Sequence, residues 1–301
     1  MAGSRERERR RARERFERQR EIQLARRRKI RQRFGIGLAI VCVLGLVGGL
    51  TAAFAGGSAP AAAKQPKATT SASASASASA TSTAAVAEPA THCTYTTSGV
   101  APAAKKVSVP PAAPNYKATY TAAINTNLGT ININLLNSKA TCTVNSFVHL
   151  ATAGYFNASQ CHRVTASNGL YVLQCGDPYA KAAAKLTCSQ AANSPGTGGP
   201  GYEFASENLP TGASSSGTVT YKAGTVAMAN SGGSATNGSQ FFLVYKNSTL
   251  GPDYTPFGTI TSGLDILQKV ANAGTSCTYS GPGDGAPKEK VIINSVTIKQ
   301  T

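Results

Sequence analysis

The stretch CHRVTASNGLYVLQCGDP, residues 161–178, contains two short apolar runs on either side of a turn. The runs QCHRV and GLYVLQCG are typical of short strands, and the TASNG segment between them is typical of a turn. Arg163 stands in the first run and Gln174 in the second; the one carboxylate of the stretch, Asp177, follows the second run, and the stretch has no second histidine or metal-ligand cluster. The sequence therefore predicts a strand pair that holds one cationic and one amide side chain on an apolar surface.

The segments around this strand pair continue the β pattern. YKATYTAAINTNLGTININLL alternates apolar and polar residues on both sides of residues 127–129, which predicts a β-hairpin. Further short β segments are predicted at GTVAMAN, SQFFLVY and TPFGTIT, and EKVIINSVTIK predicts a last strand.

Two helices are predicted among these strands. TCTVNSFVHLATAGY has apolar residues at helical spacing and Gly154 at its end, and LDILQKVANAG is the second helix. Many short strands with two helices favour a mainly β fold, a closed or nearly closed antiparallel barrel capped by the helices.

The N-terminal part has a different composition. Residues 1–34 hold 14 Arg and one Lys against five Glu, a balance of +10 within the formal charge of +17. The stretch 35–55 has no charged residue and is long enough to cross a bilayer as a helix. We predict a single-pass signal anchor in the cell membrane, with the Arg-rich segment in the cytoplasm and the rest of the chain outside.

Two alternatives accompany this prediction. Basic runs also bind nucleic acid, but the adjoining apolar segment already accounts for the charge, so we expect no nucleic-acid partner. The AFA sequence at 53–55 resembles a signal peptidase site, which leaves cleavage of the anchor open. Residues 56–92, built from Ala, Ser, Thr and Pro, are predicted to be a disordered linker. An extended lead-in, 93–116, then precedes a globular domain at 117–301.

The cysteines agree with an extracytoplasmic domain. Six of the seven follow the apolar segment, an even number in a compartment that permits disulfides. No C-x-x-C spacing occurs, so we expect no metal site.

Four segments together resemble the cyclophilin-type peptidyl-prolyl isomerases: CHRV…LYVLQCGDP, GTGGPGYEF, GTVAMANSGGSATNGSQFFLVY and YTPFG. They follow in the family's order, and the resemblance covers about residues 117–299. It implies an eight-stranded antiparallel barrel with a helix at each end, and catalysis of cis-trans isomerisation at X-Pro bonds without a cofactor.

The resemblance also implies roles for individual residues. Arg163 would donate a hydrogen bond to the imide nitrogen as amide resonance is lost, and Gln174 would orient its guanidinium. His162 precedes the arginine as in the family and is interpreted as a hydrogen-bonded structural residue beside the substrate. The residues that would line the proline pocket and the adjoining substrate groove are Tyr171, Val172, Ala229, Asn230, Gln240, Phe242, Leu250 and Tyr254.

Several positions depart from the family pattern. The usual pocket methionine is Val172 here, and the usual rim histidine is Tyr254. The chain has no Trp, whereas the cyclosporin-sensitive members carry one near the position of Thr249. The resemblance therefore predicts isomerase activity with weak cyclosporin binding. Two loops exceed the common family length and each carries a cysteine, which suggests a Cys188–Cys277 disulfide; free buried thiols are the alternative for the other four cysteines.

The leading hypothesis is thus a membrane-tethered isomerase that acts on proline-containing segments of secreted or surface proteins. A second hypothesis is a binding module or holdase that uses the same groove with little turnover. A third, a scaffold with a vestigial barrel, is disfavoured by the intact NGSQFF segment.

Overall fold

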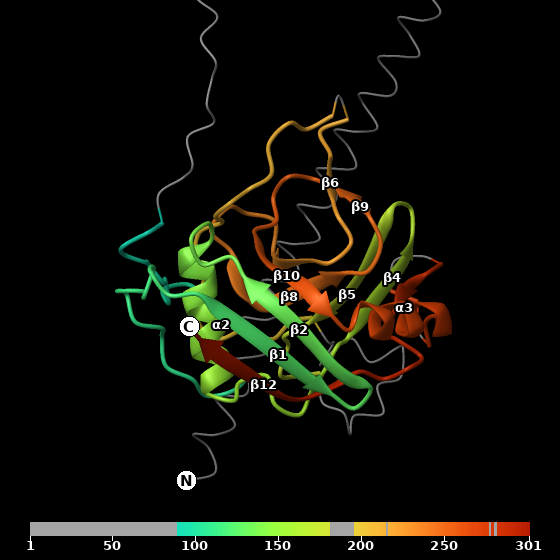
Figure 1. Ribbon diagram of the computed structural model, residues 1–301, viewed down its shortest axis with the longest axis horizontal. Helices are drawn as coiled ribbons and strands as arrows, with labels where there is room; N and C mark the ends of the chain where they lie inside the picture. Colours follow the sequence, from blue (N-terminus) through green and yellow to red (C-terminus); the bar gives the residue numbers. More distant parts are fainter. Residues whose placement is uncertain (1–88, 181–195, 215, 277, 280–281) are drawn as a thin grey trace, which may run out of the picture. The chain divides into compact units, whose positions relative to one another are not determined.

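The computed structural model describes residues 89–180, 196–214, 216–276, 278–279 and 282–301 (Figure 1). The Arg-rich segment, the predicted anchor at 35–55 and almost all of the predicted linker lie outside these residues. Within the described part of the chain, no helix is long and apolar enough to cross a membrane.

The chain forms a large, curled antiparallel sheet with a helix at each of two sides. The predicted hairpin is β1 (Tyr120–Thr126) and β2 (Gly129–Leu135), paired from Tyr120 with Leu135 to Thr126 with Gly129. Figure 1 shows α2 (Thr141–Thr152) and α3 (Leu264–Ala273) on opposite sides of the sheet. Both helices occupy the segments that apolar spacing predicted.

Most of the remaining strands lie in the predicted segments. Strands β4 (Arg163–Ser167) and β5 (Leu170–Cys175) form a hairpin, and β7 (Thr225–Asn230) and β8 (Asn237–Val244) form another. The other members of the large sheet are β3 (Ser159–Gln160), β10 (Pro256–Ser262), β11 (Asp284–Gly285) and β12 (Ile292–Gln300). A separate two-stranded sheet consists of β6 (Val219–Tyr221) and β9 (Ser248–Leu250). Strands β6, β9 and β11 were not predicted.

The prediction of a closed eight-stranded barrel is wrong. The described strands of the large sheet number ten, in the order β11-β4-β5-β8-β7-β10-β2-β1-β12-β3, and the order has two ends. The physical reason is that the chain changes partner at Cys161 and His162, between the end strand β3 and β4, which lies next to the other end strand β11. Cys161 N still donates to Val291 O beside β12, whereas His162 N donates to Gln174 O in β5.

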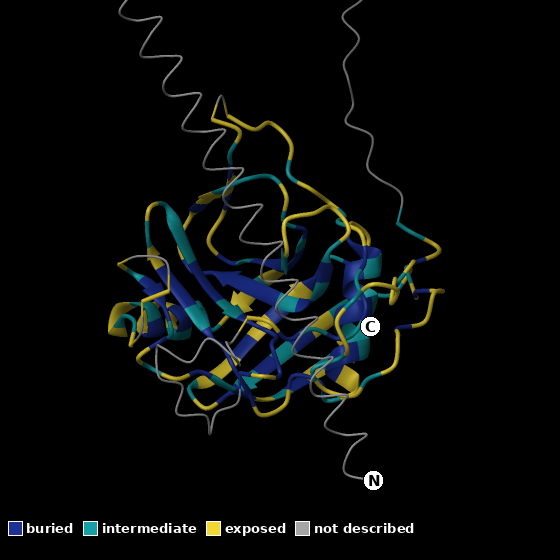
Figure 2. Cartoon of the chain, turned by 180° about the vertical axis from the view of Figure 1, so that it is seen from behind, coloured by how far each residue is buried: buried dark blue, intermediate teal, exposed yellow. Residues whose placement is uncertain are grey.

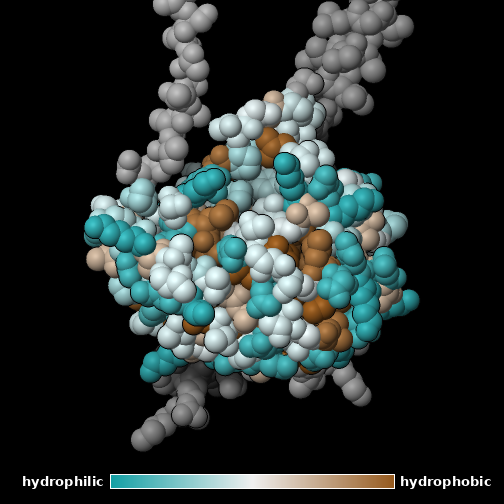
Figure 3. Space-filling view, in the orientation of Figure 1, coloured by the Kyte–Doolittle hydropathy of each residue, from teal (hydrophilic) through white to brown (hydrophobic). Residues whose placement is uncertain are grey.

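The main core fills the interior of the curled sheet, as the buried strand segments in Figure 2 show. Its largest fully buried side chains are aromatic rings and large aliphatic groups from both helices, five strands and the connecting segments: Tyr155, Tyr202, Phe156, Phe241, Phe257, Ile124, Ile131, Ile133, Leu150, Leu173, Leu243 and Leu267. The face of the domain seen in Figure 3 carries apolar patches among polar side chains.

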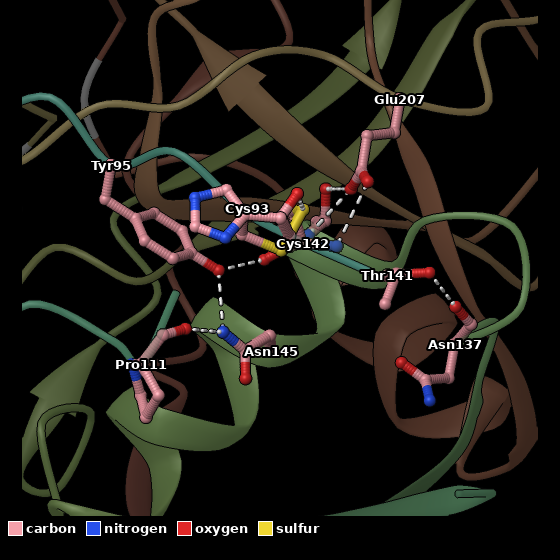
Figure 4. The surroundings of a disulfide bond; sticks show 10 residues. Cys93, Tyr95, Pro111, Asn137, Thr141, Cys142, Asn145 and Glu207 are labelled. Atoms are coloured by element: carbon pink, nitrogen blue, oxygen red, sulfur yellow. Dashed lines mark hydrogen bonds between the residues drawn. A yellow bond between two sulfur atoms is a disulfide. The ribbon is translucent and has the colours of Figure 1, made fainter. Parts of the chain in front are cut away.

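The lead-in before β1 packs on α2 (Figure 4). Cys93 is buried and forms a disulfide with Cys142 in the first turn of the helix. The Tyr95 hydroxyl donates to Cys142 O at 2.8 Å and accepts from Asn145 Nδ2 at 2.9 Å. The lead-in is therefore fixed to the domain by a covalent bond and by hydrogen bonds.

The N-terminus of α2 is capped from a distant segment. Ala140 stands at the cap position and offers no side-chain acceptor, and the backbone N–H groups of Cys142 and Thr143 donate to the Glu207 carboxylate at 3.0 and 2.7 Å. A carboxylate at this end is favoured by the helix dipole. Figure 4 shows Glu207 above the first turn of the helix.

A second disulfide joins Cys161 and Cys175 in the β4–β5 hairpin. The four cysteines for which free buried thiols were the alternative are thus paired as Cys93–Cys142 and Cys161–Cys175. Cys188 and Cys277, the pair suggested from the two long loops, lie outside the described residues.

Candidate active site

Strands β5, β7 and β8 present two apolar faces, because successive side chains of a strand point to opposite sides of the sheet. Leu173, Phe241 and Leu243 belong to the main core. Their chain neighbours Val172, Phe242 and Val244 belong to a second, smaller cluster on the other face. This outer face carries the candidate site.

The second cluster is built around the ring of Phe242. That ring lies 5.5 Å from the Tyr254 ring and 6.3 Å from the Tyr221 ring, both in edge-to-face geometry. The small β6–β9 sheet covers one side of the cluster and contributes Val219, Tyr221 and the half-buried Leu250. Five of the residues predicted for the proline pocket or its groove therefore lie together: Val172, Ala229, Phe242, Leu250 and Tyr254.

Tyr171 lies apart from this cluster. It packs against the main core, with its ring 6.1 Å from that of Tyr245. The ammonium of Lys246 lies 4.6 Å from the centroid of the Tyr171 ring. The alternation along β5 explains the separation, because Tyr171 and Val172 must point to opposite faces.

Arg163 and Gln174 are direct partners across the β4–β5 ladder. Arg163 Nη1 lies 3.4 Å from Gln174 Oε1, a long hydrogen bond. Gln174 Nε2 donates to Gln240 Oε1 at 3.0 Å, and Gln240 Nε2 donates to Gly198 O at 2.9 Å. A chain of hydrogen bonds thus joins the arginine to the two predicted glutamines.

A carboxylate that the sequence did not predict holds the other edge of the guanidinium. Arg163 Nε donates to Asp284 Oδ1 at 2.7 Å, and Arg163 Nη2 donates to Asp284 Oδ2 at 2.9 Å. The hydrogen bond to Asp284 is the main cause that raises the pKa of Arg163 above its ordinary value. Asp284 lies 121 positions from Arg163, in a glycine-rich loop with no local pattern that points to the site.

One signal in the composition does single out Arg163. It is the only arginine after residue 33, while lysines supply the basic charge in that part of the chain. After residue 33, Arg163 is therefore the only side chain with a planar fork of N–H donors. A guanidinium can make fixed, bidentate hydrogen bonds, which an ammonium group cannot.

His162 is 3% exposed, and its ring lies close to Gly196, where an added Cβ would come within 3.4 Å of Nε2. The predicted hydrogen bonding of the His162 ring is not found: neither ring nitrogen has a partner among the described residues, and the residue is joined to its surroundings through its backbone, with Tyr279 Oη donating to His162 O at 3.1 Å. Burial lowers the pKa of the ring to about 4, while Asp177 acts in the opposite direction. The imidazole is thus neutral near pH 7 and almost fully enclosed by the protein.

Asn230 lies at the end of β7, where its side chain stabilises the adjoining loops. Asn230 Nδ2 donates to Asp253 O at 2.8 Å, and Asn230 Oδ1 accepts from Gly232 N at 3.1 Å. Its amide is therefore engaged within the chain, which leaves backbone groups for a ligand on this side.

The arrangement combines a fixed cationic donor with an apolar surface. Within the described residues, no group of three or more His, Cys, Asp or Glu side chains could hold a metal ion. His162 is buried, and the Asp284 carboxylate is paired with Arg163. The chemistry that the site supports is therefore hydrogen-bond donation by Arg163 to a substrate placed on the Phe242 cluster.

A comparison with protein families identifies the same part of the chain. The family model described as "Cyclophilin type peptidyl-prolyl cis-trans isomerase/CLD" matches residues 121–298. The chain belongs to the cyclophilin family. Arg163, Gln174 and the Phe242 cluster all lie within the matched region of this cyclophilin.

Curated bacterial relatives agree with the family. The chain is 45% identical over 215 residues to "Probable peptidyl-prolyl cis-trans isomerase B" of Mycobacterium leprae, covering 69% of this chain and 66% of the relative. It is 47% identical over 180 residues to the protein of the same name in Mycobacterium tuberculosis, covering 58% of this chain and 52% of the relative. Thus the match spans about half to two thirds of the length of these relatives.

A third relative is shorter. "Peptidyl-prolyl cis-trans isomerase B" of Streptomyces anulatus is 34% identical over 194 residues, which cover 59% of this chain and 95% of that protein. The region shared with it is therefore nearly a whole protein in that organism.

Proposed function

We propose that this cyclophilin catalyses cis-trans isomerisation of X-Pro bonds in polypeptides, with Arg163 as the donor to the imide nitrogen. The observation that carries the proposal is a row of cross-strand partners. Arg163 opposes Gln174 across β4 and β5, and Gln174 opposes Phe242 across β5 and β8. Direct partners share a face of the sheet, so donor and apolar cluster lie side by side, about 10 Å apart at two strand spacings.

This spacing suits the reaction. Rotation about an X-Pro bond meets a barrier of about 20 kcal/mol, because amide conjugation is lost in the twisted state. The imide nitrogen gains a localised lone pair only in that state, so a donor aimed at it acts on the transition state more than on bound substrate. The Phe242 cluster would hold the proline ring while Arg163 reaches the nitrogen.

The test compares the wild-type full chain, purified in detergent, with Arg163→Ala in an NMR exchange or protease-coupled assay on an Ala-Pro peptide. We expect Arg163→Ala to lower kcat/KM by about 10-fold to 1000-fold. Lys299→Ala is the matched control, since Lys299 is an exposed cation on β12. A folded Arg163→Ala protein with wild-type activity would remove Arg163 from the mechanism.

The same assay separates the enzyme from a binding module that works without turnover. A binder would retain peptide affinity in the wild-type protein and show no acceleration over the uncatalysed exchange. The bidentate contact of Arg163 with Asp284 favours the enzyme, because a peptide-holding groove has little need of a donor held in one orientation.

We further propose that residues 35–55 anchor the protein in the cell membrane and that its clients are secreted or surface proteins. The sequence pattern of the anchor and two disulfides in the domain support this, since disulfides persist in oxidising compartments. Fractionation of cells and digestion by added protease provide the test. Recovery of the intact chain in the soluble fraction, protected from protease, would contradict the anchor.

A further inference from the structure

Asp284 contacts the reactive arginine from a loop that the family resemblance did not assign to the site. It belongs to the two-residue strand β11, in which Asp284 pairs with Thr165 and Gly285 with Val164 of β4. The Asp284 side chain is 10% exposed and that of Arg163 is 33% exposed. The carboxylate is therefore nearly enclosed, while part of the guanidinium remains open to a ligand.

The hydrogen bonds determine which edge of the guanidinium is open. A guanidinium has five N–H groups in a planar fork. Asp284 accepts from Nε and Nη2, and Gln174 accepts from Nη1. Among the described contacts, one N–H on Nη1 and one on Nη2 are left for a substrate.

The distances show which partner orients the fork. The two contacts with Asp284 are 2.7 and 2.9 Å, within the range of charge-assisted bidentate pairs, whereas the contact with Gln174 is 3.4 Å. A bidentate pair fixes both the plane and the rotation of the guanidinium, and one long hydrogen bond fixes neither. Asp284 is thus the principal orienting group, a role that the resemblance implied for Gln174.

The loop that carries Asp284 is itself fixed on the hairpin. Ala166 N donates to Gly283 O at 2.7 Å, and Tyr279 N donates to Asp284 O at 2.8 Å. Gly283 has a φ of +75°, a conformation that favours glycine, and an added Cβ would approach Ser167 Cβ to 3.2 Å. The carboxylate is therefore held on β4 by backbone as well as by its ion pair.

We propose that Asp284 is a positioning residue for the isomerase reaction. It holds the Arg163 guanidinium by its Nε–Nη2 edge and so directs the remaining Nη1 and Nη2 hydrogens to the imide nitrogen. This inference rests on the proposed function, because it requires Arg163 to be the donor. Asp284 contacts no substrate atom in this scheme and acts through the arginine.

The first test measures kcat and KM of the full chain with Asp284→Ala and Asp284→Asn. We expect Asp284→Ala to lower kcat by about 10-fold to 100-fold with KM changed less than about twofold, since a misaligned donor affects the transition state most. Asp284→Asn keeps one acceptor and nearly the same shape, so its loss should be smaller. Asp265→Ala, which removes an exposed carboxylate from the first turn of α3, is the matched control and should behave as wild type.

A double-mutant cycle shows whether the effect passes through the arginine. In an Arg163→Lys background, the fork is absent, so Asp284→Asn should cause no further loss in kcat. The Arg163 Nε–H signal in nitrogen NMR spectra, identified by its disappearance in Arg163→Lys, should sharpen or move in Asp284→Asn, because the restrained pair is lost. If Asp284→Ala fails to fold, Asp284→Asn alone carries both measurements.

The outcomes separate this inference from the proposed function. If Arg163→Ala is inactive while folded Asp284→Ala and Asp284→Asn match wild type, the positioning role is wrong and the proposed function stands. Equal losses from Asp284→Asn in the wild-type and Arg163→Lys backgrounds would also overturn the role, since the carboxylate would then act through the fold. Full activity of Arg163→Ala would remove the proposed function itself.

Discussion

The disulfide between Cys161 and Cys175 links the residue two positions before β4 to the last residue of β5, close to the Arg163–Gln174 pair. The Cα atoms of the two cysteines lie 4.0 Å apart, and the β4–β5 ladder begins just beyond them with Arg163 and Gln174 as partners. The hairpin is therefore covalently closed next to Arg163 and Gln174, while Asp284 holds the Arg163 guanidinium.

Replacing both cysteines should lower stability more than activity. Cys161→Ala with Cys175→Ala removes a cross-link between residues 14 positions apart, worth about 3 kcal/mol of unfolding free energy in the chain-entropy account. We expect kcat/KM to change less than about threefold below the unfolding transition, because the contacts of Arg163 with Asp284 and Gln174 remain. Urea unfolding and the peptide assay measure the two effects.

The paired control is Cys93→Ala with Cys142→Ala, whose loop of 49 residues lies away from the hairpin and should cost about 4 kcal/mol. Non-reducing peptide mapping tests the pairings and also the predicted Cys188–Cys277 bond. A Cys161 peptide linked to any cysteine other than Cys175 would contradict this account of the hairpin.

Phe242→Ala should weaken substrate binding and destabilise the domain. The ring is 5% exposed, and its removal should raise KM by at least about 10-fold and lower the unfolding free energy by about 3–5 kcal/mol. Phe241→Ala is the control from the opposite face of the same strand, with a similar loss of stability and a KM within about twofold of wild type. An unchanged KM in folded Phe242→Ala would place the proline elsewhere.

Acid should destabilise the fold through His162. Its pKa is about 4 in the folded chain and 6.5 as the ordinary value, so the unfolded chain binds more protons between these pH values. The unfolding free energy is therefore unaffected by this group above about pH 6.5. It decreases as the pH falls from 6.5 to 4, and below pH 4 the group causes no further change. The total loss of unfolding free energy from this group is about 3 kcal/mol.

Urea unfolding at several pH values checks this, with His162→Leu as the comparison. The variant should lose less stability than wild type between pH 7 and pH 4, because other titrating groups are common to both proteins. If the unfolding free energies of wild type and His162→Leu changed equally with pH, the lowered pKa of His162 would be wrong.

Cyclosporin should inhibit this cyclophilin weakly. Thr249 is exposed on β9 and provides neither an indole N–H nor a large apolar face. Thr249→Trp should increase sensitivity by at least about 10-fold, the equivalent of about 1.4 kcal/mol. Thr259→Trp, on an exposed position of β10, is the control; nanomolar inhibition of the wild type would show that another residue replaces the missing Trp.

The strands and helices were predictable because their signals are local. Alternation in β1 and β2 and helical spacing in α2 depend on neighbouring residues, and the structure confirms all of these elements. The closure of the barrel was not predictable in this way. It depends on where the stretch 159–167 changes partner, and no periodicity marks Cys161 and His162 as that point.

Only those site residues that lie in recognisable sequence motifs could be predicted. Gln174 and Phe242 lie in recognisable segments, and cross-strand pairing brings them together. Asp284 stands alone among glycines and a proline, and only the β11–β4 pairing brings it to Arg163. The described cysteine pairs show the same limit, since no sequence pattern indicated that Cys93 lies beside Cys142.

The bond between Cys93 and Cys142 determines where a pulling force on the N-terminal side enters the domain. Tension would act on the first turn of α2, and the 27 positions from Cys93 to Tyr120 would carry none of it. Reduction would transfer the load to the hydrogen bonds of Tyr95 and its neighbours. If these also broke, the segment could extend by up to about 90 Å, at roughly 3.3–3.6 Å per residue. The oxidation state of one bond thus sets how far the active site can travel from whatever the N-terminal segment is attached to.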